Sequence, residues 1–241
     1  MAFSKVVVNV PDVQLTFKSG AIDYAKKEVK LSNVNTLKRI NATYGVYINK
    51  WGSLLFIPNG VISGFIATES SGQMVGPNKF EATGLMQATP PSVYDAISGW
   101  KKEVKDPIPA EILQELNAKA KFLLNGTAYS SCKSQILNLL KTDASFNILA
   151  GCMILRWMFE RFSNNGSALF NRALVAYNAG AYTSTQLSKA PGAKSTDPNR
   201  TIADTATLVA NVYVPKESRY YLVKMLGVDG FLDLIYRQNL V

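Results

Sequence analysis

One segment organises the chain, and it reads Val61-Ile62-Ser63-Gly64-Phe65-Ile66-Ala67-Thr68-Glu69. Counted back from Glu69, its large apolar residues stand at i−3, i−4, i−7 and i−8. These offsets share one face of an α-helix. We therefore expect an apolar helix whose buried stripe is extended at its C-terminal end by an acid, Glu69.

The predicted position of Glu69 suits a general acid. Burial disfavours the charged form of a carboxyl group, and the negative end of the helix dipole disfavours it as well. Both effects raise the pKa, which is how a carboxyl group keeps a proton to donate near neutral pH. The alternative is a glutamate that ends the helix and turns into solvent.

Further blocks of residues follow Glu69 in a set order. They are Ser70, Gly84-Leu85-Met86-Gln87, Asn147-Ile148 with Gly151, Ala176-Tyr177-Asn178-Ala179-Gly180, and Glu217-Ser218 with Tyr221. In their order these blocks resemble the soluble lytic transglycosylase family, relatives of goose-type lysozyme that cleave peptidoglycan. The resemblance covers roughly residues 55–226.

The resemblance implies a mainly α fold with a lysozyme-like helical domain. We expect that domain at residues 51–241, after an N-terminal extension at residues 1–50 that is first strand-like and then helical. Residues 99–142 are longer than the family's usual connection, and their pattern predicts an inserted pair of helices. The first of these helices is expected to begin at Pro109 and to stop near Asn125. The inserted pair is either one wall of the substrate groove or scaffold.

The resemblance also implies a reaction. It is cleavage of the β-1,4 bond between N-acetylmuramic acid and N-acetylglucosamine, with formation of a 1,6-anhydro sugar and without water. Ordinary glycosidases need two carboxylates, whereas here a single acid, Glu69, is expected to act first as acid and then as base. Substrate-binding or supporting roles are expected for Ser70, Gln87, Thr89, Tyr177, Asn178, Glu217 and Tyr221.

Structural explanations compete with several of these roles. Ser70 hydrogen-bonds the acid or the sugar, or it caps the end of its helix. Tyr177 orients the catalytic carboxylate, as the resemblance implies, or it is a buried aromatic before a helix stop. Asn178 serves equally well as a cap. Glu217 contacts substrate or braces Tyr177, or it forms a structural ion pair with Arg219 or Lys224.

The chain departs from the family pattern at some positions. Gly72 stands where the family often has an aromatic residue, and Glu81 stands where glycine is usual. Thr89 replaces an apolar residue, often methionine, that touches sugar in relatives. These changes bear on subsite preference and loop shape, and they leave the acid in place.

The composition excludes several kinds of site. The chain has no histidine, which rules out Ser-His and Cys-His pairs and histidine metal sites. Two cysteines are too few for a structural zinc site, so we expect no metal and no cofactor. Cys152 falls on an apolar helical stripe that predicts a buried thiol, while a bridge to Cys132 stays open.

A net charge of +9 at pH 7 favours polyanionic partners. The basic residues are scattered and form no dense arginine run, which argues against a nucleic-acid partner. The partner that the resemblance implies is the glycan strand of peptidoglycan.

The N-terminal residues predict no signal peptide, and no apolar stretch of the sequence approaches the ~20 residues that span a bilayer. Residues 5–18 alternate in a strand-like way and predict a docking strand, and residues 183–201 predict a surface loop beside the groove. A wall-cleaving enzyme without an export signal needs another route to its substrate. A bacteriophage origin supplies one, as a lysin released towards the periplasm or as a virion component whose N-terminal segment contacts other virion or tail proteins.

Two other functions fit the same residues. A goose-type lysozyme hydrolyses the same bond with water, and it differs in the sugar ends that it releases. A wall-binding virion component that has lost its activity would keep the fold, and an intact Glu69 argues against it.

Overall fold

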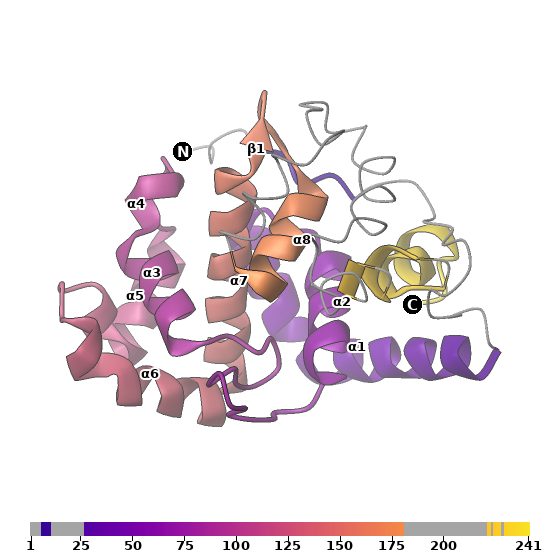
Figure 1. The fold of residues 1–241 in the computed structure, drawn as a ribbon, viewed down its shortest axis with the longest axis horizontal. Helices are drawn as coiled ribbons and strands as arrows, with labels where there is room; N and C mark the ends of the chain where they lie inside the picture. The colour runs from indigo at the N-terminus through magenta and orange to yellow at the C-terminus, as the bar shows by residue number, and fades with distance from the viewer. Residues whose placement is uncertain (1–5, 11–26, 181–220, 223, 228) are drawn as a thin grey trace.

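The computed structural model describes residues 6–10, 27–180, 221–222, 224–227 and 229–241. Over these residues the chain is mainly helical, as the sequence predicted (Figure 1). The elements are α1 (Lys27–Leu55), α2 (Asn59–Ser70), α3 (Pro90–Ser98), α4 (Trp100–Glu103), α5 (Ala110–Lys119), η1 (Lys121–Leu123), α6 (Tyr129–Thr142), α7 (Ala144–Arg161), β1 (Ser163–Asn164), β2 (Ser167–Ala168), α8 (Phe170–Ala179) and the π-helical turn η3 (Asp233–Arg237). Residues 221–222 and 224–226 are helical as well. None of the helices in this part of the chain is long and apolar enough to cross a membrane.

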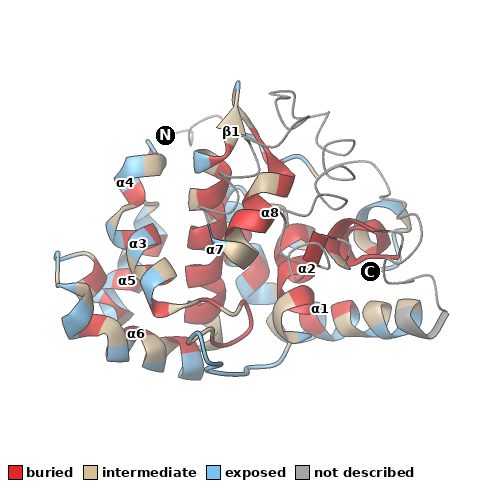
Figure 2. Ribbon diagram, in the orientation of Figure 1, coloured by how far each residue is buried: buried red, intermediate tan, exposed pale blue. Residues whose placement is uncertain are grey.

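Helix α7 is the central element of the fold. It contacts α1, α3, α4, α6 and α8, and Figure 2 shows it buried along most of its length. Asp143 caps its start, because Asp143 Oδ1 accepts a hydrogen bond from Phe146 N at 2.8 Å. The predicted helix through Asn147 and Gly151 is therefore confirmed, and its side chains fill the centre of the core.

Helix α2 packs against α1 and carries the predicted apolar stripe. The residues of that stripe are fully buried, and they are Val61, Ile62, Phe65 and Ile66. The helix ends just past Glu69, because Ser71 adopts a left-handed conformation with φ 52°. The N–H of Ser71 donates to Ala67 O at 3.1 Å and closes the last turn. Glu69 thus occupies the final turn of a buried helix.

The predicted inserted pair of helices is present as α5 and α6. Pro109 directly precedes α5, as expected. The first helix is shorter than predicted, since α5 stops at Lys119 and the short turn η1 follows. Ala120 leaves the helical region with φ −142°. The ammonium of Lys119 lies 2.7 Å from Asp143 Oδ2, which ties the end of α5 to the start of α7.

Of the strand-like stretch predicted for residues 5–18, the structure describes residues 6–10, where Val7 forms an isolated parallel bridge to Ser167 of β2. Val7 N donates to Gly166 O at 2.8 Å, and Ala168 N donates to Val7 O at 3.0 Å. Arg156 is fully buried and donates to Val6 O at 3.2 Å. Residues 11–18, residues 183–201 and Glu217 lie outside the described residues, and so do the predictions made for them.

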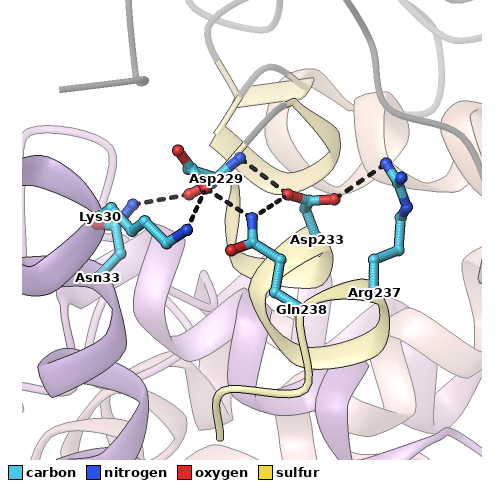
Figure 3. Close-up of polar contacts among 6 residues, drawn as sticks. All are labelled: Lys30, Asn33, Asp229, Asp233, Arg237 and Gln238. Atoms are coloured by element: carbon cyan, nitrogen blue, oxygen red, sulfur yellow. Dashed lines mark hydrogen bonds and ion pairs between the residues drawn. The ribbon is translucent and has the colours of Figure 1, made fainter. Parts of the chain in front are cut away.

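The C-terminal residues are fastened to α1 by a buried polar network (Figure 3). Asp229 and Asp233 are 7% and 4% exposed. Gln238 Nε2 donates to both, at 2.6 Å to Asp229 Oδ1 and at 2.8 Å to Asp233 Oδ2. From α1, the Lys30 ammonium lies 3.3 Å from Asp229 Oδ1, and Asn33 Nδ2 donates to Asp229 O at 3.3 Å. Figure 1 shows the C-terminal turns lying beside α1 and α2 as a result.

The two cysteines are separate. Cys132 on α6 and Cys152 on α7 are both buried and free. Burial raises the pKa of the Cys152 thiol, which keeps it protonated and unreactive. The bridge that the sequence left open is therefore not formed.

Candidate active site

Glu69 receives a hydrogen bond from a residue far along the chain. Tyr221 Oη donates to Glu69 Oε1 at 2.8 Å. Tyr221 is 6% exposed, whereas Glu69 is only half-buried. The acid is thus held by a buried hydroxyl while part of its side chain stays accessible to solvent.

Three aromatic rings, one of them from α2 itself, meet near Glu69. Phe65 stands one turn before Glu69. The ring of Tyr177 meets Phe65 edge-on with centroids 5.0 Å apart, and the ring of Tyr221 does so at 6.1 Å. These rings come from α2, α8 and residues 221–226, so the carboxyl group sits where three elements converge beside an apolar wall.

Both tyrosines are hydrogen-bond donors at neutral pH. Burial raises the pKa of Tyr177 and of Tyr221 well above the usual tyrosine value, and the negative charge of Glu69 raises both further. Tyr177 Oη donates to Met86 O at 2.7 Å. The hydroxyl that donates to the acid is therefore that of Tyr221, while Tyr177 connects α8 to the Gly84–Gln87 turn beside it.

Ser70 and Gln87 hold that turn together. Ser70 Oγ donates to Leu85 O at 2.7 Å and lies 3.1 Å from Ile66 O. Gln87 Nε2 lies 2.9 Å from Gly84 O and 3.2 Å from Val75 O. Both side chains donate their hydrogen bonds to backbone carbonyls. Of the roles expected from the sequence, these contacts fit a supporting role for Ser70 and Gln87.

Thr89 also has a structural partner. It is the N-cap of α3, where its Oγ1 accepts a hydrogen bond from Ser92 N at 3.4 Å and lies 2.8 Å from Ser92 Oγ. A hydroxyl used in this way explains a threonine here without a sugar contact. Asn178 lies half-buried in the last turn of α8, directly after Tyr177.

Asn147 of α7 holds the Gly84–Gln87 turn through hydrogen bonds. From the sequence, this residue was assigned no role in the site. It is fully buried, and its Oδ1 accepts a hydrogen bond from Met86 N at 3.0 Å. Its Nδ2 donates to Thr83 O at 3.0 Å and to Leu140 O at 2.9 Å. Gly84 has to be glycine, because φ is +80° and an added Cβ would lie 2.6 Å from Asn147 Cγ. In the sequence, the signal for this role was a single amide side chain, Asn147, among the mostly apolar residues of the predicted helix.

Lys224 is a second functional candidate that the sequence analysis considered only as an ion-pair partner. Its ammonium donates to Thr68 O at 3.3 Å, the carbonyl just before Glu69. Burial lowers the pKa of Lys224, and the charge of Glu69 acts in the opposite direction. Its place three residues after Tyr221, one helical turn further on, was the signal in the sequence.

The inserted helices contact the loop between the acid and the Gly84–Gln87 turn. Lys133 of α6 lies 2.7 Å from Glu81 Oε1, and Glu81 has φ 63°. Glu81, which stands where the family usually has glycine, thus adopts the positive φ that glycine favours and also forms an ion pair. A groove of about 510 Å³ lies elsewhere, between the end of α1 and residues 106–113, and it includes none of the predicted site residues.

No protein-family model matches the chain, and no curated protein matches it significantly. A function must therefore be inferred from the site itself. Among the described residues, the site brings together the carboxyl group of Glu69, the hydroxyls of Tyr177 and Tyr221 and the ammonium of Lys224. No cluster of metal-ligating side chains occurs in the part of the chain that the structure describes.

Proposed function

We propose that the chain is a peptidoglycan lytic transglycosylase with Glu69 as its general acid and base. The observation that carries the proposal is the hydrogen bond from Tyr221 Oη to Glu69 Oε1 at 2.8 Å. It joins two sequence blocks that resemble the family's catalytic blocks. The two residues are 152 positions apart in the sequence, so the fold brings them together.

The proposed reaction needs a single carboxyl group. Protonated Glu69 gives its proton to the glycosidic oxygen, the bond from C1 to that oxygen breaks, and the substrate's acetamido group stabilises the cation at C1. The Glu69 carboxylate then takes the proton of the C6 hydroxyl, and O6 bonds to C1. A 1,6-anhydro sugar and a free hydroxyl end result, Glu69 is protonated again, and no water is consumed.

The surroundings of Glu69 support this use of one acid. Of the acidic residues that the structure describes, Glu69 alone acts electrostatically on Tyr177, Tyr221 and Lys224 together. A retaining or inverting hydrolase places a second carboxylate within about 5–10 Å of the first. Among the described residues, this arrangement supports substrate-assisted chemistry with Glu69 as the one acid.

The test is digestion of purified sacculi followed by mass spectrometry of the released muropeptides. We expect anhydro ends, lighter by one water than hydrolysed ends. Glu69→Gln should reduce the rate by a factor on the order of 10²–10⁴ and leave the circular dichroism spectrum unchanged. The control is Glu111→Gln, which changes an exposed glutamate in the first turn of α5.

Each other outcome has a definite meaning. Reducing ends would make the enzyme a hydrolase like goose-type lysozyme. Full activity of the Glu69→Gln variant would remove Glu69 from the chemistry. Binding to sacculi without any cleavage by the wild type would make the chain a wall-binding protein.

A further inference from the structure

Lys224 is withdrawn from water in the immediate neighbourhood of the proposed acid. It stands one helical turn after Tyr221, and its described hydrogen bond goes to Thr68 O at 3.3 Å. Burial lowers the pKa of its ammonium, and the charge of Glu69 opposes that effect. Partial desolvation of an ammonium is unfavourable unless an opposite charge compensates it. In the described part of the chain, Glu69 is the acidic group whose charge offsets part of this cost, and the pKa of Lys224 stays lowered.

The proposed reaction leaves a negative charge on Glu69 that is poorly solvated. Once its proton has passed to the leaving oxygen, Glu69 is a carboxylate beside a wall formed by Phe65, Tyr177 and Tyr221. Aromatic rings replace the hydration of an anion poorly. Tyr221 supplies a hydrogen bond, and a neutral hydroxyl compensates a full negative charge only in part.

We propose that Lys224 is the counter-charge of Glu69, stabilising its carboxylate between proton donation to the leaving oxygen and proton removal from the C6 hydroxyl. The inference rests on the proposed function, because it assigns Lys224 to one half of that reaction. Lys224 acts through Glu69 and touches no reacting atom, so it is a positioning residue.

The described charged and titratable groups around Glu69 come from three other elements. Residues 221–226 contribute Tyr221 and Lys224, α8 contributes Tyr177, and α1 contributes Arg39, which donates to Ser71 O at 2.6 Å. The tyrosines are neutral because their pKa values are raised. Two cations remain, and Lys224 is the one that lies one helical turn after Tyr221, whose hydroxyl bonds the acid.

The direct test is titration of the Glu69 carboxyl carbon by NMR in protein labelled with 13C-glutamate. The Glu69 signal is the one missing from Glu69→Gln. Removal of a cation disfavours the carboxylate, so Lys224→Met should raise the titration midpoint of Glu69 by about one pH unit. Lys224→Arg keeps the charge and should leave the midpoint near the wild-type value, as should Lys141→Met, which changes an exposed lysine on α6.

An equal midpoint in wild type and Lys224→Met overturns the proposal. Lys224→Gln replaces Lys224→Met if the methionine variant does not fold, because it is uncharged and keeps a donor for Thr68 O. This titration needs no activity, so it tests Lys224 even if the wild type releases no anhydro ends and the proposed function fails.

Kinetics give the second readout. The general acid must be protonated to act, so the alkaline limb of kcat/KM against pH should move upwards in Lys224→Met by the same shift as the NMR midpoint. The rate at the optimum should fall several-fold, because the carboxylate has lost its counter-charge. A shifted NMR midpoint with an unshifted rate profile overturns the assignment of Lys224 to the reaction.

Discussion

Tyr221 and Glu69 are 152 positions apart in the sequence, and Tyr221 Oη donates to Glu69 Oε1 at 2.8 Å. The contact depends on the packing of the C-terminal helical residues on α2. Thr68 Oγ1 lies 2.9 Å from the sulfur of Met225, and a Cβ added at Gly64 would lie 2.9 Å from Leu232 Cδ2. The acid is therefore positioned by the packing of the C-terminal helical residues on α2.

The first prediction concerns the two tyrosines. Tyr221→Phe removes a hydrogen bond to a charged group, which contributes about 1.5–3 kcal/mol. We expect kcat/KM on sacculi to fall by about tenfold to a hundredfold, with the fold unchanged. Tyr177→Phe removes a bond to Met86 O and leaves Glu69 with Tyr221, so its loss should be smaller.

Turnover of purified sacculi by the two phenylalanine variants, measured side by side, checks this order. If Tyr221→Phe keeps wild-type activity, the hydroxyl of Tyr221 does not contribute to the reaction. A larger loss for Tyr177→Phe than for Tyr221→Phe would move the orienting role to Tyr177.

The helices were predictable because their signal is local. The apolar stripe of α2 and the core helix α7 repeat at helical spacing, and Pro109 precedes α5 in the expected way. The end of α5 at Lys119 was not predictable, because it accompanies an ion pair with Asp143, which lies 24 positions further along the chain.

The site was predictable only in part, for a physical reason. The type of a polar side chain does not reveal whether its partner is substrate or backbone. Ser70, Gln87 and Thr89 are satisfied by Leu85 O, Gly84 O and Ser92 N, and such partners become visible only when the loop geometry is known. Tyr221 was found through the resemblance, since no local pattern joins it to Glu69.

The second prediction concerns Asn147, whose amide makes three hydrogen bonds to backbone groups. Asn147→Asp keeps the acceptor for Met86 N and replaces the donor to Thr83 O and Leu140 O by a carboxylate oxygen. Two buried carbonyls then lose their donor and face an acid. We expect a loss of about 3 kcal/mol or more in the free energy of unfolding, measured by urea denaturation.

The control for this variant is Asn138→Asp, because Asn138 is exposed on α6. Its unfolding free energy should stay within about 0.5 kcal/mol of the wild type. Equal denaturation midpoints for Asn147→Asp and Asn138→Asp would contradict the bracing role of Asn147.

The third prediction compares one substitution at two helical glycines. At Gly151 in α7, an added Cβ would lie 2.7 Å from Met86 Cβ, so Gly151→Ala should destabilise by about 1–3 kcal/mol. At Gly45 in α1 nothing lies within 4 Å of an added Cβ. Gly45→Ala should stabilise by up to about 1 kcal/mol, since alanine favours a helix.

Thermal unfolding of both variants measures this difference. Opposite shifts of Tm are expected, and a fall in activity should accompany Gly151→Ala alone, because Met86 carries the carbonyl that holds Tyr177. Two shifts of the same sign would show that the contact between Gly151 and Met86 is not tight.

The last prediction concerns acid stability and Asp143. Burial acts to raise the pKa of this carboxyl group, but hydrogen bonds from Lys119 and Phe146 N, together with the charge of Lys119, outweigh burial and lower it. A lowered folded-state pKa means that the stabilisation is present above the unfolded value near 3.8 and is lost as pH falls through the folded value. Asp143→Asn keeps an acceptor for the cap of α7 and loses the ion pair. Urea unfolding should show Asp143→Asn less stable than wild type by about 1 kcal/mol at pH 7, with the difference shrinking below about pH 4. A constant difference across that pH range would mean that the charge of Asp143 does not contribute to stability.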